Sequence, residues 1–175
     1  MTVLRSLKWH GWLGLAILVG AEALMLARQP FVATWFTPIE WTGYILLADA
    51  LILRKRGASL LHDRLREAPF MALLSILGWL VFEAYNLRLA NWAYVGVPAA
   101  PLARTFGYGW SFATIFPGIF QTADLLAAYG VFSRSAWRPI RWTPGQIALS
   151  VVVGLALAAI PLALPARIGA YLFGA

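Results

Sequence analysis

Acidic side chains lie inside the most apolar stretches of this sequence. Of the seven acidic residues, five fall within segments apolar enough to cross a bilayer: Glu22, Glu40, Asp49, Glu83 and Asp124. An ionisable group is costly at that depth unless it faces a partner, a bound molecule or water. We therefore expect that something between these segments uses negative charge, proton exchange or hydrogen bonding.

Counting along each segment places the polar side chains at two depths. Glu40 lies about 14 Å into its segment, near the membrane midplane, whereas Glu22 and Glu83 lie in outer halves. Asn86 follows Glu83 by three residues and shares its helical face. We call these four residues, with Arg88, the predicted outer group.

The predicted inner group consists of Asp49, Gln121 and Asp124, toward the cytoplasmic side. Gln121 and Asp124 are three residues apart and share a face. Asp49 has an alternative explanation, because Arg54 follows it closely and the Asp49 carboxyl could extend toward the basic residues at the membrane surface.

Glu40 and Glu83 are the candidate catalytic residues. A buried carboxyl group without a neighbouring cation is largely neutral, and a neutral carboxyl can donate a proton, as acid catalysis on an apolar substrate requires. The alternative is a structural pair with Arg88. Glu22 has a similar alternative in Arg28 or the outer interface.

Residues 82–94, with the sequence FEAYNLRLANWAY, form the densest polar motif. One interpretation is an interfacial cap, with aromatic rings at headgroup level and Arg88 on a phosphate. The other is one wall of a pocket that opens to the outer leaflet. In the second case the ligand-binding residues are Asn86, Arg88, Asn91, Trp92, Tyr94, Glu22 and Thr114.

The composition indicates an all-α, polytopic integral membrane protein. The chain is 61% hydrophobic and 12% charged, against about a quarter charged in soluble domains. Five membrane-spanning helices of about 19–25 residues are expected, in a single domain over residues 1–175. Their ranges are about 9–27, 31–53, 69–89, 108–132 and 146–164.

The basic residues predict the orientation of these helices. Ten of the 14 lysines and arginines lie on one side, which places the N-terminus in the cytoplasm and the C-terminus outside. The protein is thus expected as a multi-pass protein of the inner (plasma) membrane. The segment Phe36-Thr37-Pro38 predicts a kink in the second helix, and residues 60–67 a short amphipathic helix on the membrane surface.

The sequence lacks the residues that several kinds of chemistry need. There is no cysteine for a disulfide or a thiolate nucleophile. His10 and His62 have no second ligand at metal spacing, and no nucleotide-binding motif is present. We therefore expect no metal and no cofactor. The net charge of +7 comes from basic residues that flank apolar segments and meet anionic headgroups, so nucleic acid is not an expected partner.

Short patterns in residues 35–126 resemble an uncharacterised group of bacterial polytopic membrane proteins, which has no known activity. The patterns are Thr37-Pro38, Trp41–Tyr44, Gly57, Ser59–Leu61, Phe82–Asn86, Asn91-Trp92 and Trp110–Thr114.

Phe82-Glu83 and Trp92 are also similar to two elements of the lycopene cyclase domain, an aromatic–acid pair and a tryptophan at the helix exit. The third element, Pro-x-Glu-Glu on the next helix, is not matched after Pro117. The resemblance implies an isoprenoid-sized pocket with acidic groups.

The first functional hypothesis is a membrane protein that binds or transforms an isoprenoid or another lipid. Glu40 and Glu83 would be its acid, base or recognition groups. A second is a structural or assembly subunit of a larger membrane complex. A third is a proton-coupled carrier, since acids at several depths suit a relay. The expected partners are membrane lipids and a lipid or isoprenoid ligand, and assembly as a homo-oligomer or within a larger complex stays open.

Overall fold

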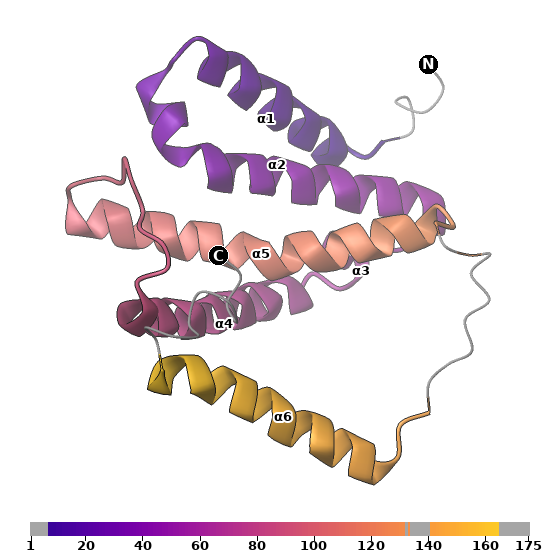
Figure 1. The fold of residues 1–175 in the computed structure, drawn as a ribbon. Helices are drawn as coiled ribbons and strands as arrows, with labels where there is room; N and C mark the ends of the chain where they lie inside the picture. The colour runs from indigo at the N-terminus through magenta and orange to yellow at the C-terminus, as the bar shows by residue number, and fades with distance from the viewer. Residues whose placement is uncertain (1–6, 132, 134–140, 165–175) are drawn as a thin grey trace. The chain divides into compact units, whose positions relative to one another are not determined.

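The computed structural model describes residues 7–131, 133 and 141–164, in which all regular secondary structure is helical. Figure 1 shows the helices in chain order. They are α1 (Trp9–Leu26), α2 (Pro30–Arg56), α3 (Leu60–Asp63), α4 (Glu67–Leu89), α5 (Pro101–Ala128) and α6 (Pro144–Ala163).

Four of these helices are long and apolar enough to cross a membrane, namely α1, α2, α4 and α6. This finding agrees with the predicted all-α class and supports a membrane protein. α5 is longer than α1 but more polar. It begins at Pro101 rather than near Tyr108, because proline is favoured in the first turn and Gly107 continues the helix.

Contacts divide the chain into two compact units, which we describe separately. Unit 1 comprises Met1–Trp79 and Gly96–Arg134, and unit 2 comprises Leu80–Val95 and Ser135–Ala175. α4 therefore contributes its first part to unit 1 and its last part to unit 2. The single domain that the sequence predicts stays a prediction.

In unit 1, α1 and α2 form an antiparallel hairpin (Figure 1). The two backbones approach closely because glycines face one another. A Cβ atom on Gly14 would lie 2.6 Å from the carbonyl oxygen of Gly43, and one on Gly11 would lie 2.5 Å from the Cβ of Ala50. Small residues that let backbones touch are a common means of joining helices in membranes.

The connection between α1 and α2 is short. Arg28 adopts a positive φ of 57°, which turns the chain directly after α1. Gln29 then caps α2, since its side-chain oxygen accepts a hydrogen bond from Val32 N at 2.8 Å. The cap satisfies one of the free N–H groups at the start of a helix.

α2 is kinked, as the sequence predicts. Trp35 has non-helical angles (φ −109°, ψ 17°), three residues before Pro38. Proline has no N–H to donate, and its ring clashes with the carbonyl group four residues earlier. Trp35 and Trp41 flank this kink and rest on glycines of α5, where a Cβ on Gly107 or Gly118 would collide with their rings.

α4 meets α5 through a buried serine. Ser75 Oγ donates to the carbonyl oxygen of Phe112 at 2.5 Å and accepts from Phe116 N at 2.9 Å. In a regular helix these two backbone groups pair with each other. The hydroxyl group therefore enters the hydrogen-bond ladder of α5 directly before Pro117, which lies inside the helix.

The segment 60–67 is not one helix. Only Leu60–Asp63 is helical, and Arg64 leaves the helical region with φ −125° and ψ 34°. α4 then begins at Glu67. The expected amphipathic helix over residues 60–67 is therefore wrong, because its polar side chains form local contacts that end the helix after one turn.

Unit 2 contains the end of α4 and α6. α6 begins with a capping box, in which Gln146 N donates to Thr143 Oγ1 at 3.2 Å and Thr143 N donates to Gln146 Oε1 at 2.8 Å. Such reciprocal bonds fix the start of a helix. Tyr85 of α4 donates its hydroxyl hydrogen to the carbonyl oxygen of Ala158 at 2.9 Å and so joins the two helices.

The glycine contact between α1 and α2 makes a paired prediction. Gly14→Ala should destabilise the protein by about 1–3 kcal/mol, the usual cost of overpacking, because backbone atoms of Gly43 and Leu47 cannot move aside. Gly20→Ala is the control, since nothing lies within 4 Å of its Cβ position. Thermal unfolding in mild detergent, followed by tryptophan fluorescence, measures both. Equal midpoints for the two variants would contradict the close approach.

Candidate functional site

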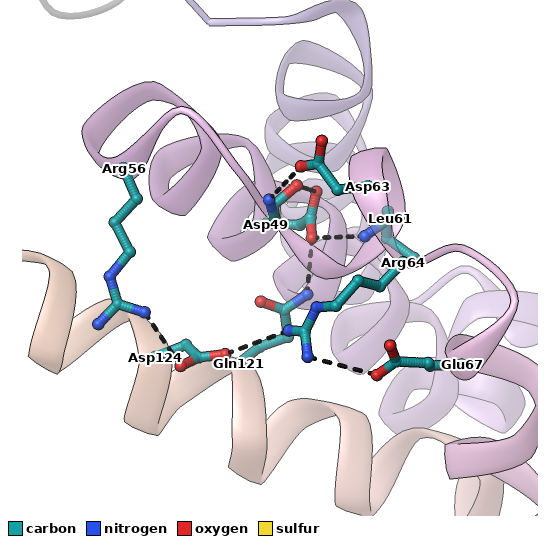
Figure 2. A network of polar contacts seen from close by, with 9 residues as sticks. Asp49, Arg56, Leu61, Asp63, Arg64, Glu67, Gln121 and Asp124 are labelled. Atoms are coloured by element: carbon teal, nitrogen blue, oxygen red, sulfur yellow. Dashed lines mark hydrogen bonds and ion pairs between the residues drawn. The ribbon is translucent and has the colours of Figure 1, made fainter.

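Asp49 is the centre of a buried polar network in unit 1 (Figure 2). Its side chain is 0% exposed and accepts hydrogen bonds from Ser59 Oγ at 2.8 Å, Leu61 N at 2.9 Å and Gln121 Nε2 at 2.8 Å. His10 Nε2 lies 3.2 Å from Asp49 Oδ2. The carboxylate thus connects α1, α2, the start of α3 and α5.

These contacts decide between the two explanations of Asp49. The side chain does not extend toward Arg54, because it is fully buried and points to Gln121 and Ser59. Both carboxylate oxygens have donors, so no oxygen is left for a ligand. A buried charge with this many hydrogen bonds has the environment that buried charges need, and we interpret Asp49 as a structural residue.

The start of α3 depends on the same network. Ser59 precedes the helix, but its hydroxyl binds Asp49 and makes no cap. Asp63 instead accepts a hydrogen bond from Ser59 N at 2.7 Å, and Asp49 accepts one from Leu61 N. The bond from Ser59 N, followed by the neighbouring His62, lowers the pKa of Asp63.

Asp124 is separate from Asp49, so the predicted inner group is only partly assembled. Its side chain is 43% exposed and forms ion pairs with Arg56 Nη1 at 3.1 Å and Arg64 Nη2 at 3.9 Å. Arg64 also contacts Glu67 at 3.3 Å. Figure 2 shows Asp124 directed toward these arginines and Gln121 toward Asp49. Exposed pairs of this kind contribute at most about 1 kcal/mol.

Glu40 lines an open groove of about 340 Å³ in unit 1. The other lining residues are Leu18 of α1, Trp41 and Tyr44 of α2, and Thr122 of α5. Tyr44 Oη and Thr122 Oγ1 form a hydrogen bond of 2.5 Å beside it. The groove is therefore mainly apolar, with a carboxyl group and two hydroxyl groups at defined positions.

The Glu40 carboxyl lacks the partners that Asp49 has. Its Oε1 atom is buried and has no hydrogen-bond partner within the structure described. Glu22 lies near enough to interact with it electrostatically, so two members of the predicted outer group do come together. Among the described residues, neither acid has an ion pair with a basic side chain, and Glu22 does not pair with Arg28.

Glu83 lies in unit 2, and its side chain accepts hydrogen bonds from the loop that follows α4. Trp92 Nε1 and Tyr94 Oη donate to Glu83 Oε1 at 3.3 and 2.5 Å. Asn86 binds the backbone of Trp92 on both sides, donating to its carbonyl oxygen at 2.8 Å and accepting from its N–H at 3.1 Å. These hydrogen bonds hold the loop against the end of α4. They favour a structural role for Glu83.

The remaining candidate ligand residues are placed as follows. Arg88 and Asn91 are exposed, and no ion pair joins Arg88 to Glu83 in the described ranges. Thr114 is buried, and its hydroxyl donates to the carbonyl oxygen of Ser111 at 2.8 Å. Glu40 lies in unit 1 and Glu83 in unit 2, so we describe their surroundings separately.

Sequence reasoning missed four groove residues, namely Leu18, Trp41, Tyr44 and Thr122. Tyr44 follows Glu40 by four positions and therefore lies on the same helical face, a signal that could have been used. Thr122 and Leu18 become groove residues only through the way α5 and α1 pack on α2. That packing depends on the glycine contacts, which the sequence alone does not pair.

Comparisons with protein-family models, curated proteins and solved structures find no match to this chain. Within the described ranges, no group of three or more His, Cys, Asp or Glu side chains could hold a metal ion. The groove beside Glu40 is the feature of the described residues that best supports a function.

Asp49 and Asp124, both drawn in Figure 2, make the second prediction. Asp49→Ala leaves Gln121, Ser59 and the Leu61 N–H without their shared acceptor and should cost about 3–5 kcal/mol, as for a broken buried pair. Asp124→Ala removes only exposed ion pairs and should cost no more than about 1 kcal/mol. The unfolding midpoint in detergent measures both changes. A loss for Asp124→Ala as large as that for Asp49→Ala would contradict the structural role of Asp49.

Proposed function

We propose that this chain is a multi-pass inner-membrane (plasma-membrane) protein that binds an isoprenoid or another lipid in the groove beside Glu40. The observation that carries the proposal is an acid without a hydrogen-bond partner in a mainly apolar groove. The groove lies on α1 and α2, which are apolar enough to cross a membrane. An acid in such a segment usually marks a functional site.

The size and lining of the groove support this proposal. Its volume of about 340 Å³ is at the lower end of ligand pockets, which run to roughly 1,000 Å³. It suits the polar end of a lipid and the first part of its chain, with the rest extending into the bilayer through the open side. Leu18 and Trp41 supply apolar contact.

Energetics favour an occupied groove. A buried polar atom without a hydrogen bond costs about 1–3 kcal/mol, and the Glu40 carboxyl carries such an atom. A ligand group that donates to Glu40 removes this cost in the bound state only. In this proposal Glu40 recognises the ligand, whereas Glu83, which Trp92 and Tyr94 hold, stabilises the loop after α4.

We further propose that α5 is a fifth span, with the N-terminus in the cytoplasm and the C-terminus outside. α5 has 28 residues, enough to cross about 30 Å of hydrocarbon. Two of its polar side chains, Thr114 and Gln121, are buried. Part of its lower hydropathy therefore comes from polar side chains that are buried inside the protein. The uneven distribution of basic residues supports the orientation.

Single cysteines test this topology, since the chain has none of its own. Ala58, Ala99 and Ser133 are exposed positions between or after helices. A membrane-impermeant maleimide should label Ala99→Cys in intact cells, or in spheroplasts where an outer membrane blocks access. Ala58→Cys and Ser133→Cys should react only after permeabilisation. Labelling of both Ala99→Cys and Ser133→Cys would show that α5 does not cross, and the reverse pattern would invert the orientation.

Mass spectrometry of lipids retained by gently purified protein tests the function. The wild type should retain one lipid class above its share of the membrane. Glu40→Leu should lower that enrichment about tenfold, since the loss of one hydrogen bond to a charged or buried group has that size. Asp124 is an acidic residue outside the groove. Asp124→Asn is therefore the matched control and should retain the lipid.

Bulk membrane lipid alone in the wild type would contradict the proposal. If stoichiometric proteins also co-purified, the result would favour the assembly-subunit hypothesis. Equal enrichment in the wild type and Glu40→Leu would place the lipid elsewhere on the protein.

A further inference from the structure

We infer that the ligand of this groove is a lipid alcohol, a long apolar chain or ring system that ends in a hydroxyl group. The inference rests on the proposed function and names the chemical class of its ligand. It follows from an account of every hydrogen-bonding side chain that lines the groove.

The hydroxyl hydrogens beside Glu40 are already committed. Thr122 Oγ1 lies 2.7 Å from the carbonyl oxygen of Gly118, and because a carbonyl cannot donate, the Thr122 hydrogen points there. Thr122 Oγ1 must then be the acceptor in its 2.5 Å contact with Tyr44 Oη. The single hydroxyl hydrogen of Tyr44 is thereby also used.

The groove consequently offers acceptors to a ligand. Tyr44 Oη keeps a free lone pair, and the Glu40 carboxyl keeps its acceptor capacity, with Oε1 lacking any partner among the described residues. The terminal torsion of a glutamate side chain is soft, so the carboxyl can turn an oxygen toward the groove. A ligand that brings a hydrogen-bond donor therefore satisfies these acceptors.

Anionic lipids do not fit this environment. Glu22 and Glu40 interact with each other, and in the described part of the chain neither has a basic partner. A carboxylate or phosphate headgroup would find no basic side chain there to offset its charge, and an unpaired charge is costly in a medium of low dielectric constant.

A hydroxyl group fits better than an ammonium group. The Glu40 carboxyl in the groove accepts hydrogen bonds when it is ionised, and when it is neutral it can also donate one. An alcohol can donate to Glu40 in either state and can accept from its neutral form, whereas an ammonium group can only donate and brings a charge into an apolar groove. The alcohol thus serves the Glu40 carboxyl in both of its states.

The test uses four ligands that share one chain: hexadecanol, hexadecylamine, palmitic acid and hexadecyl methyl ether. Each is added to purified wild type in mild detergent, and bound ligand is counted by native mass spectrometry. The ether retains the chain and an acceptor oxygen but has no donor. Hexadecanol should bind about tenfold better than the ether, the size expected for one hydrogen bond, and better than the amine or the acid.

Three variants make the test specific. Glu40→Gln keeps a carbonyl acceptor and should keep the preference for alcohol over ether, whereas Glu40→Leu should abolish that preference. Asp124→Asn should behave as the wild type. Because preference is a ratio within one protein, partial loss of stability in a variant does not mimic the result.

The outcomes separate this inference from the proposed function. Binding of none of the four ligands would overturn the proposed function itself. Equal binding of alcohol and ether would leave lipid binding intact but overturn the inference. Stronger binding of the amine or the acid would also overturn it, as would a preference for alcohol that survives in Glu40→Leu.

Discussion

The carboxylate of Asp49 is the interaction on which the arrangement of unit 1 depends. It is fully buried and has donors from Gln121, Ser59 and Leu61, with His10 close by. A charge in this position is stable only when all of these groups surround it. The contact therefore sets which residues of α2 and α5 lie opposite one another.

That alignment also creates the groove. Tyr44 lies five residues before Asp49 on α2, and its hydroxyl meets that of Thr122, which directly follows Gln121 on α5. Glu40 lies a further turn along α2, on the face that Tyr44 shares. α2 thus carries two acids with different environments. Both oxygens of Asp49 accept hydrogen bonds and join helices, whereas Glu40 has an oxygen without a hydrogen-bond partner beside an apolar wall. This contrast distinguishes a structural acid from a candidate ligand-binding acid.

The sequence predicts much of the helical pattern, because length and apolar composition are local properties. The kink near Pro38 follows from its missing N–H and is confirmed. Contacts between helices were harder to predict. Spacing grouped Asp124 with Gln121, but a side chain nearer the helix end reaches Arg56 and Arg64. The partners of Glu83 lie in a loop whose path depends on Asn86, and helical periodicity does not describe loops.

The Asp49 contact has a consequence for the order of assembly during synthesis. The close contacts of the α1–α2 hairpin lie within α1, α2 and the residues just before them, so it can form as soon as residue 56 has entered the membrane. Gln121 lies 72 positions after Asp49, so until α5 is inserted Asp49 lacks one of its donors. Before α5 is inserted, the Asp49 carboxylate of the hairpin therefore lacks a hydrogen-bond donor within the hydrocarbon. Docking of α5 supplies that donor, so this step stabilises the finished protein relative to the partly synthesised chain.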